Sequence, residues 1–383
     1  MRRPLSTEAA FLYMDYNATT PVAPSVRDAV TICLDETWAN PSSGHPLGRK
    51  AREVLEAART SMASLLKADS GEIVFTSGGT ESNNAVLLGI VPGLFPAKAH
   101  VVTTQIEHPS VLNPAIRLME LGYEVTFVGV DRQGVVSPDA VDAALRPETV
   151  LVSVMLANNE TGAVQPVGEI ARRARARGVL VHTDAAQAIG KMSVDVRELD
   201  VDYLTVAGHK LYAPKGIGAL FMRKGAPIAP FLYGSGQEAG RRPGTEPVPM
   251  AVGLGEAARL AGEDLAGEAA RLVRLRERLF DGILSLRRPV VRHGTPKTTL
   301  SNTLCVSFPG LIGAKILEEA SPLMASTGAA CHDRTVAVSH VLSAMGVDQE
   351  VALGTIRLSL GRWTRDADVE RAVDALDRAI RSM

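Results

Sequence analysis

One motif combines glycine and hydroxyl residues in a way that could bind an anion. TSGGTESNN (76–84) directly follows an apolar run and begins a stretch with helical character. Main-chain N–H groups of Gly78, Gly79 and Thr80 could therefore meet a phosphate at the start of a helix. Taken alone, the motif is equally typical of a glycine-rich turn in which Thr80 caps the helix.

Two further motifs place a carboxylate and an amine at the ends of apolar runs. HTDAAQA (182–188) contains Asp184, and AGHKLYAPKG (207–216) contains His209 and Lys210. Ligands collect at the carboxyl ends of strands in open α/β sheets. Taken singly, however, such an aspartate is more often a helix N-cap, and such a lysine is usually a solvated surface residue.

The three motifs together indicate one kind of site. A phosphate cradle, a strand-end carboxylate and a strand-end lysine are the parts that pyridoxal 5′-phosphate requires. Lys210 would form an imine with the cofactor. Asp184 would keep the pyridine nitrogen protonated, so that the ring can accept the electrons of a substrate carbanion. The sequence therefore predicts an enzyme that uses this cofactor.

From about Met14 to its C-terminus, the chain resembles the cysteine desulfurases (NifS/IscS-like) of the class V aminotransferase superfamily. The resemblance rests on nine motifs that follow one another in order. They are MDYNATTP (14–21), TSGGTESNN, IEHPSV (106–111), ANNETG (157–162), HTDAAQ (182–187), GHKLYAPKGIGAL (208–220), RRPGTE (241–246), STGAAC (326–331) and IRLSLGRWT (356–364). It implies pyridoxal 5′-phosphate and the fold of type I pyridoxal enzymes.

The resemblance also assigns roles around the cofactor ring. Lys210 would carry the cofactor and, once released by the substrate, move the substrate's α-proton as a general base. His108 would lie over the ring and assist this proton transfer. Asp184 would pair with the ring nitrogen, and Gln187 would hydrogen-bond the phenolic oxygen.

At the phosphate, the resemblance implies two sources of contacts. Gly79, Thr80 and His209 would hold the phosphate from within the chain. Thr245 would reach it from the other subunit, which implies an obligate homodimer.

The remaining roles implied by the resemblance concern L-cysteine. Asn159 and Arg357 would bind its carboxylate, Arg357 through a bidentate pair that lysine cannot copy. Cys331, within MASTGAACHDR (324–334), would attack the substrate's sulfur and carry it away as a persulfide. A persulfide implies an acceptor or scaffold protein, as in iron–sulfur cluster assembly, tRNA thiolation or a dedicated cofactor route.

Departures from the family pattern raise an alternative. Ala207 stands where the family often has serine, and Thr205 is the nearest hydroxyl that could replace it. The residues His332, Asp333 and Arg334 follow Cys331 in place of a Thr/Ser-rich continuation. Ala207 and the pair Cys331-His332 also resemble selenocysteine lyases, which prefer selenium over sulfur.

Two other functions are considered. In an ordinary class V aminotransferase or lyase, Cys331 would be incidental and the amino group would pass to a 2-oxo acid. A catalytically silent scaffold would keep the fold and be colourless. The presence of Lys210, Asp184, His108 and Arg357 argues against a scaffold.

Composition excludes several classes of protein. The 383 residues are 46% hydrophobic and 22% charged with a net charge of −1, which favours neither nucleic acid nor a membrane surface. Three cysteines without CxxC spacing indicate neither a disulfide framework nor a metal site. With no signal-peptide pattern, we expect a cytoplasmic protein. Cys33 and Cys305 fit core positions, and His182 is a histidine to follow because it lies near Asp184.

Apolar runs and helical stretches alternate along the first two thirds of the chain. Seven runs predict a mostly parallel sheet with helices on both faces, namely 72–77, 100–106, 123–130, 149–157, 178–186, 202–208 and 218–223. Beyond residue 250 we expect one long helix (251–284), strands at 303–309 and 355–360, and a closing helix (366–381). The prediction is an α/β domain over 14–250 and a smaller α+β domain over 251–383, on which residues 1–13 pack.

Overall fold

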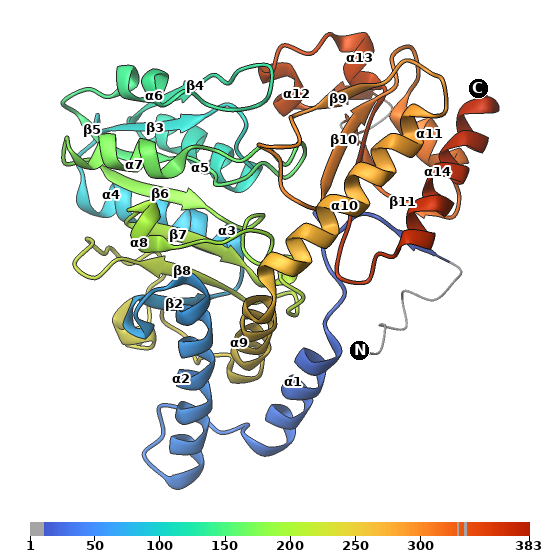
Figure 1. Cartoon of the computed structure of the whole chain (residues 1–383). Coiled ribbons are helices and arrows are strands. Elements are labelled where there is room, and N and C mark those ends of the chain that lie inside the picture. The colour runs from blue at the N-terminus through green and yellow to red at the C-terminus, as the bar shows by residue number, and fades with distance from the viewer. Residues whose placement is uncertain (1–10, 328, 333–334) are drawn as a thin grey trace.

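A large sheet forms the centre of the computed structural model, which describes residues 11–327, 329–332 and 335–383, leaving out the side chains of 329–332 and 335–337. The sheet has seven strands in the order β2-β8-β7-β6-β5-β3-β4 (Figure 1). They are β2 (Ile73–Thr76), β3 (His100–Thr104), β4 (Glu124–Val128), β5 (Thr149–Ser153), β6 (Leu180–Asp184), β7 (Tyr203–Ala207) and β8 (Gly218–Met222). Only β8 is antiparallel to its neighbours, so the predicted seven-stranded, mostly parallel sheet is confirmed.

Helices cover both faces of this sheet, as the alternation predicts. Alternate strand residues such as Phe75 and Val206 join one core, whereas Val74 and Tyr203 join another. The first core is covered by α1 (Pro24–Glu36), α2 (Pro46–Leu66), α6 (Pro138–Ala144), α7 (Val167–Arg175), α8 (Val196–Leu199) and α9 (Val248–Glu263). The second is covered by η3 (Ala85–Ile90), α4 (Val91–Leu94) and α5 (Pro109–Glu120). The first two continue from α3 (Gly79–Asn84), and α5 follows β3.

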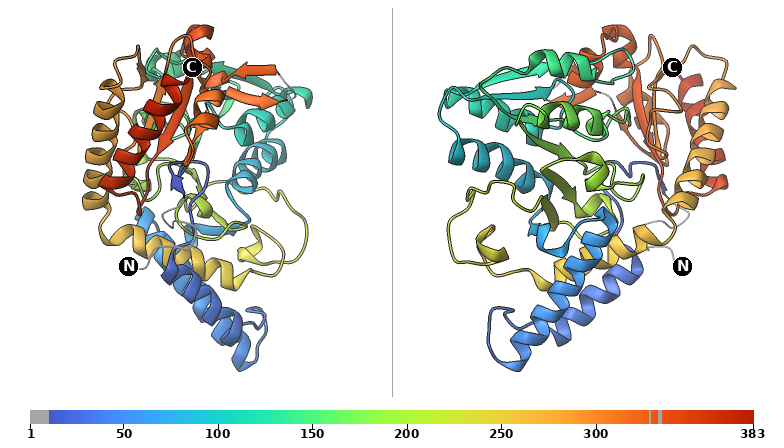
Figure 2. Two further views of the ribbon diagram at one scale, coloured as in Figure 1. Left: turned by 90° about the vertical axis from the view of Figure 1, so that its right-hand side faces the viewer. Right: turned by 60° about the vertical axis from the view of Figure 1, so that its left-hand side comes forward.

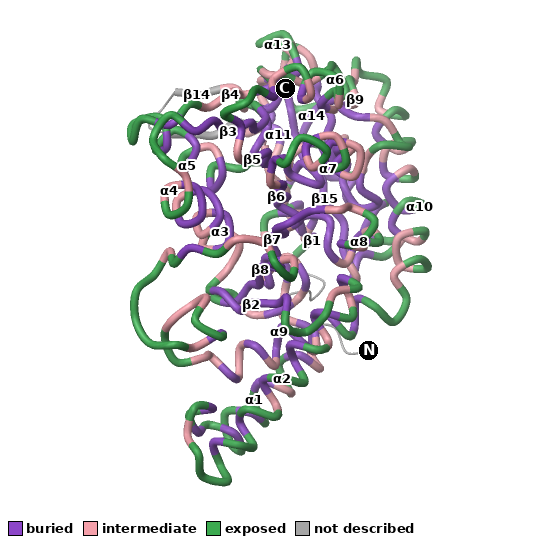
Figure 3. The backbone as a smooth tube through the Cα atoms, turned by 90° about the vertical axis from the view of Figure 1, so that its left-hand side faces the viewer, coloured by how far each residue is buried: buried purple, intermediate pink, exposed green. Residues whose placement is uncertain are grey.

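The strands therefore lie between two apolar layers. Figure 2 shows helices on either side of the sheet, and Figure 3 shows its strands as buried while the far ends of α1 and α2 are mostly exposed. None of the helices in the described part of the chain combines the length and apolar composition needed to span a bilayer.

A smaller antiparallel sheet organises the C-terminal part. Its strand order is β12-β15-β10-β9, comprising β9 (Val291–His293), β10 (Thr303–Ser307), β12 (Ser326–Thr327) and β15 (Thr355–Ser359). Its core includes residues of α10 (Leu265–Leu284), α11 (Gly313–Glu319) and α14 (Asp366–Arg381). Between these lie β11 (Leu323–Met324), the hairpin β13 (Ala329–His332) and β14 (Thr335–Val338), α12 (His340–Ala344) and α13 (Gln349–Leu353). The predicted strands and closing helix are confirmed.

The expected single helix over 251–284 is wrong, because the chain forms two helices, α9 and α10. Asp264 between them has φ −149° and ψ 55°, and its carboxylate accepts a hydrogen bond from Gly267 N at 3.1 Å. An aspartate at this position satisfies an otherwise unpaired N–H of the first turn of α10. The cap ends one helix and begins the next.

The N-terminal segment connects the small sheet to the large one. β1 (Leu12–Tyr13) pairs in parallel with β11, and Leu12 and Met14 belong to the C-terminal core. The chain then crosses to the large sheet, where Thr20 N donates to His209 O at 2.9 Å. Residues 1–10 lie outside the described part of the chain, and the domain bounds at 14, 250 and 251 stay predictions.

Candidate functional site

A cavity of about 470 Å³ opens at the carboxyl ends of β3, β5, β6 and β7. It is within the size range of small-molecule sites. Nine of the residues singled out from sequence line it together: Gly79, Thr80, His108, Asn159, Asp184, Gln187, His209, Lys210 and Arg357. Parallel strands end at the same edge, and this explains how motifs far apart in the chain meet here.

Lys210 follows β7 in a single helical turn, η4 (Gly208–Lys210). Its Nζ donates to the main-chain oxygens of Asn17 and Ala18, the latter at 2.7 Å. Burial, and next the positive charge of Arg357, lower the pKa of Lys210 to about 8. Lys210 is thus no solvated surface lysine, and near neutral pH it can lose its proton with little cost.

A chain of hydrogen bonds links Asp184 to His108. Asn83 Nδ2 donates both to Asp184 Oδ2 and to Ser110 Oγ, each at 2.8 Å. His108 Nδ1 accepts from Ser110 N at 3.1 Å and lies 2.8 Å from Ser110 Oγ. The proton of the neutral ring is therefore on Nε2. Burial lowers the pKa of His108, and Lys210 lowers it further while Asp184 opposes the shift.

The glycine-rich turn between β2 and α3 has the geometry of an anion cradle. Gly78, which precedes the helix, has φ 152° and makes no side-chain cap, so Thr80 is not the N-cap. The turn lies against β8 so closely that a Cβ on Gly218 would meet Gly78 Cα at 2.7 Å. Gly79 and Thr80 line the cavity at this helix start, where the first main-chain N–H groups have no partner within the helix and are suited to an anion.

Ala207 lines the same part of the cavity, but Thr205 does not supply a replacement hydroxyl. Thr205 is fully buried, and its Oγ1 lies 3.1 Å from His182 Nε2. The other ring nitrogen of His182 lies 2.8 Å from Ser153 Oγ. Burial lowers the pKa of His182 to about 4, so it is a neutral core histidine held between two hydroxyls.

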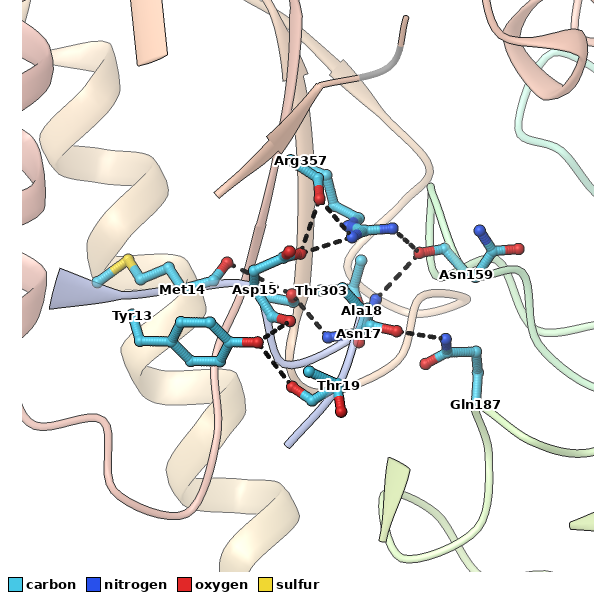
Figure 4. A network of polar contacts seen from close by, with 12 residues as sticks. Tyr13, Met14, Asp15, Asn17, Ala18, Thr19, Asn159, Gln187, Thr303 and Arg357 are labelled. Atoms are coloured by element: carbon cyan, nitrogen blue, oxygen red, sulfur yellow. Dashed lines mark hydrogen bonds and ion pairs between the residues drawn. The ribbon is translucent and has the colours of Figure 1, made fainter. Parts of the chain in front are cut away.

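Arg357 lies at the opposite end of the cavity, in β15 (Figure 4). Its Nη1 donates to Asn159 O at 3.0 Å, and its Nη2 donates to Asp15 Oδ1 at 2.6 Å and Ser326 Oγ at 2.8 Å. Its Nε is buried and, among the described residues, has no hydrogen-bond partner. A guanidinium that is held in place and lines the cavity suits binding of a carboxylate.

Asn17 lies between the two ends of the cavity. Figure 4 shows it between Gln187 and Asn159. Its main-chain oxygen accepts from Gln187 Nε2 at 2.9 Å, and its side-chain Oδ1 accepts from Lys191 Nζ at 3.0 Å. Its Nδ2 donates to Asn159 O at 3.2 Å. One buried asparagine thus contacts the groups that flank the cavity on both sides.

The predicted nucleophile Cys331 lies in β13, paired across the hairpin with Val336, and its side chain is outside what the structure describes. Thr245 is exposed and does not line the cavity. Cys33 in α1 and Cys305 in β10 are buried free thiols, as the sequence predicts. Burial raises the pKa of Cys305, so this thiol is a poor nucleophile.

The segment after Cys331 is attached to the loops that follow β3 and β5, beside the cavity. Ser339 Oγ donates to Glu160 Oε2, next in the chain to Asn159. His340 Nε2 lies 2.9 Å from the main-chain oxygen of Glu107, next to His108. His340 therefore has a definite structural contact with the main chain beside His108.

Comparisons with known proteins agree over nearly the whole chain. The profile of the family "Aminotransferase class-V" matches residues 12–372. Cysteine desulfurase IscS of Methanosarcina thermophila is 41% identical over 99% of this chain and 94% of its own length, and Cysteine desulfurase IscS 1 of Archaeoglobus fulgidus is 42% identical over 96% of each. The chain belongs to the class V aminotransferase family.

Solved structures of this family are also similar. A "NIFS-LIKE PROTEIN" superposes with a TM-score of 0.92 at 36% identity, covering 97% of this chain and 100% of the other. A structure described as "SspA in complex with cysteine" gives a TM-score of 0.81 at 35% identity, covering 92% and 99%. These matches confirm the fold type I architecture that the resemblance implied.

The cofactor of the family is pyridoxal 5′-phosphate, and the cavity fits it. The amine of Lys210, the carboxylate of Asp184 and the glycine turn at Gly79 are the three chemical partners that the aldehyde, ring nitrogen and phosphate require. A methyl group on Gly79 would stand 3.4 Å from Ala207 Cβ and would narrow the end of the cavity where the phosphate would lie.

Sequence reasoning missed several polar residues behind the cavity wall. Glu107 is fully buried, and its Oε1 accepts from Thr104 Oγ1 at 2.7 Å and from Met155 N at 2.9 Å. Burial raises the pKa of Glu107 to about 8, so the carboxyl group is mostly protonated at neutral pH. The residues around it, TTQIEHPS (103–110), are mostly polar, so the sequence contains no local signal of its burial.

We predict that Glu107→Gln removes a pH dependence of stability. Between its usual pKa of 4.5 and about 8, folded Glu107 keeps a proton that the unfolded chain has released. Raising the pH therefore lowers the free energy of unfolding of the parent by up to about 1.4 kcal/mol per pH unit, a term that glutamine lacks. Guanidinium unfolding at pH 5.5, 6.5 and 7.5 measures it.

As the pH rises, the free energy of unfolding of Glu107→Gln should therefore increase relative to that of the parent. Glu120→Gln, an exposed change on α5, is the control and should follow the parent curve. Parallel curves for the parent and Glu107→Gln over this range would contradict a protonated Glu107.

Proposed function

We propose that this chain is a cysteine desulfurase that converts L-cysteine to L-alanine and takes the sulfur onto Cys331 as a persulfide. The observation that carries the proposal is the joint position of Lys210, His108 and Arg357 in one cavity. The near full-length similarity to cysteine desulfurases supports it. Pyridoxal 5′-phosphate, when bound, supplies an electron sink for the carbanion of the substrate.

The phosphate and ring of the cofactor have separate partners in the proposal. Gly79, Thr80 and His209 hold the phosphate. Asp184 would meet the ring nitrogen, and its carboxylate is held in place because it accepts from Asn83 Nδ2 at 2.8 Å and from Ala186 N at 2.9 Å. Burial and the charge of Lys210 lower the pKa of His209 to about 4, so His209 meets the phosphate as a neutral donor.

In the proposal, different residues of the cavity bind the substrate and transfer its proton. Arg357 and Asn159 take the carboxylate of cysteine, which places its α-carbon toward Lys210. The pKa of Lys210 near 8 lets its amine accept the α-proton. His108, whose Nε2 carries the ring proton, would donate that proton in the cavity and is held in place through its Nδ1 by Ser110.

The sulfur step forms one bond and breaks one. The thiolate of Cys331 attacks the sulfur of the substrate, an S–S bond forms, and the C–S bond breaks. The electron pair stays with the substrate carbon, which gains a proton and leaves as alanine. Cys331 then bears the persulfide that an acceptor or scaffold protein removes. A thiol that cycles in this way requires a reducing compartment, and we propose the cytoplasm.

We further propose a homodimer in which Thr245 contacts the phosphate in the partner's cavity. Thr245 is exposed and is not part of the cavity of its own chain. The segment that leads to it carries the exposed apolar side chains of Leu232 and Tyr233, which are 40% and 88% exposed. Aromatic residues of this kind are enriched at protein interfaces.

Cys331→Ala should retain the bound cofactor and its yellow colour but lose sulfur uptake. Removing the nucleophile should lower alanine formation from cysteine at least roughly a hundredfold. Mass spectrometry after brief exposure to cysteine should show one added sulfur atom on the peptide with Cys331 in the parent and in the control Cys33→Ala. Unchanged alanine release by Cys331→Ala would refute the proposal.

Arg357→Lys should raise KM for cysteine roughly tenfold or more and change kcat by less than about threefold. Lysine cannot form the bidentate pair with a carboxylate, and the carboxylate is bound equally in the ground and transition states. Steady-state alanine production measures both constants. Arg378→Lys, an exposed change on α14, serves as the control. If kcat fell while KM stayed constant, Arg357 would have another role.

Thr245→Ala should weaken cofactor binding although Thr245 lies outside the cavity of its own chain. Loss of a hydrogen bond to a phosphate should raise Kd for pyridoxal 5′-phosphate roughly tenfold, measured by titrating the apoprotein. Sedimentation velocity should give a dimer for the parent and the variant. A monomeric parent, together with a Kd for pyridoxal 5′-phosphate that is the same in Thr245→Ala as in the parent, would overturn the dimer proposal.

A further inference from the structure

Lys191 is buried behind the cavity and, within the part of the chain that the structure describes, makes no ion pair with a carboxylate. Its side chain is 9% exposed, and its Nζ donates to Gln187 Oε1 at 2.7 Å and to Asn17 Oδ1 at 3.0 Å. A buried lysine is costly unless it is paired. The other charges that act on it, those of Lys210 and Arg357, are positive, and with burial they lower its pKa well below the usual 10.5.

The two hydrogen bonds of Gln187 fix which way its amide points. Oε1 accepts from Lys191 Nζ, and Nε2 donates to the main-chain oxygen of Asn17 at 2.9 Å. If the amide were turned over, its NH₂ group would face the amine of Lys191 and its oxygen would face the carbonyl of Asn17. Donor would meet donor and acceptor would meet acceptor, so only one orientation is compatible with both neighbours.

This orientation leaves a donor toward the cavity. The amide nitrogen of Gln187 has two N–H groups, and within the described residues its hydrogen bond to Asn17 uses one of them. Gln187 itself lines the cavity. The second N–H can therefore meet an anionic oxygen of the ligand, whereas a turned amide would present its own oxygen and repel it.

We propose that Lys191 is a positioning residue for the cofactor, which fixes the side-chain amide of Gln187 so that an N–H group faces the phenolic oxygen of pyridoxal 5′-phosphate. The inference rests on the proposed function only through the role of Gln187. Lys191 does not line the cavity and acts through Gln187.

A double-mutant cycle tests the proposal. Lys191→Met, Gln187→Ala and the combined variant are compared with the parent by two readouts: Kd of the apoprotein for pyridoxal 5′-phosphate, and the absorption spectrum of the bound cofactor as a function of pH. We expect Lys191→Met to raise Kd roughly tenfold and to move the spectrum in the same direction as Gln187→Ala. The combined variant should be no weaker than Gln187→Ala alone.

Two further variants separate positioning from a purely structural role. Lys191→Gln keeps an N–H donor and should bind the cofactor more tightly than Lys191→Met, and it serves as the test if the methionine variant does not fold. Lys315→Met, an exposed change on α11, should match the parent.

Three results would overturn the proposal. The first is an unchanged spectrum and Kd in Lys191→Met. The second is a combined variant whose loss of cofactor affinity equals the product of the losses in the two single variants. The third is an equal Kd for Lys191→Gln and Lys191→Met. None of the readouts uses cysteine. A failure here is thus distinct from absence of sulfur on Cys331, which would refute only the desulfurase function.

Discussion

The buried side chain of Asn17 is the point on which the arrangement of the cavity depends. Asn17 is 1% exposed, and its polar groups contact both the large sheet and the C-terminal sheet. Its partners are Gln187, Lys191 and Lys210 from the large domain, Asn159 from the loop after β5, and Asn302, Thr303 and Ser359 from the C-terminal part. An unpaired polar group in such a place costs free energy, so the two parts can shift relative to each other only by breaking several of these bonds together.

The electrostatics of the cavity follow from the same burial. Burial and the positive charge of Arg357 lower the pKa of both Lys210 and Lys191, and the charge of Lys210 also lowers that of Lys191. Asp15 and Asp184 provide the nearby negative charge and oppose the shift of Lys210. Anionic ligands relieve this repulsion, which suits a phosphate-bearing cofactor and a carboxylate substrate. The lowered pKa of Lys210 is a further result, because the field that attracts the anions also makes its amine a usable base.

The sequence predicted the parts of the fold that local pattern determines. Buried strands such as β6 and β7 are apolar on both faces, so they are visible as continuous runs, and the motifs at their ends predicted nine cavity residues. The break at Asp264 was missed because an Ala/Leu/Arg-rich pattern continues on both sides of it. Lys191 and Glu107 were missed for another reason. Lys191 contacts Asn17, which lies 174 positions away in the chain, and Glu107 contacts Met155, 48 positions away, so no local pattern reports either contact.

The segment that carries Cys331 is tied at both ends to residues that flank the substrate groups. Before it, Ser326 Oγ accepts from Arg357 Nη2 and donates to Asp15 Oδ1 at 2.9 Å. After it, Ser339 donates to Glu160, which follows Asn159 in the chain. In the proposed function, a carboxylate bound between Arg357 and Asn159 would be held by residues whose neighbours also hold the ends of the segment that carries Cys331. The same few contacts would then position both the substrate and this segment, which is what transfer of a sulfur atom between them requires.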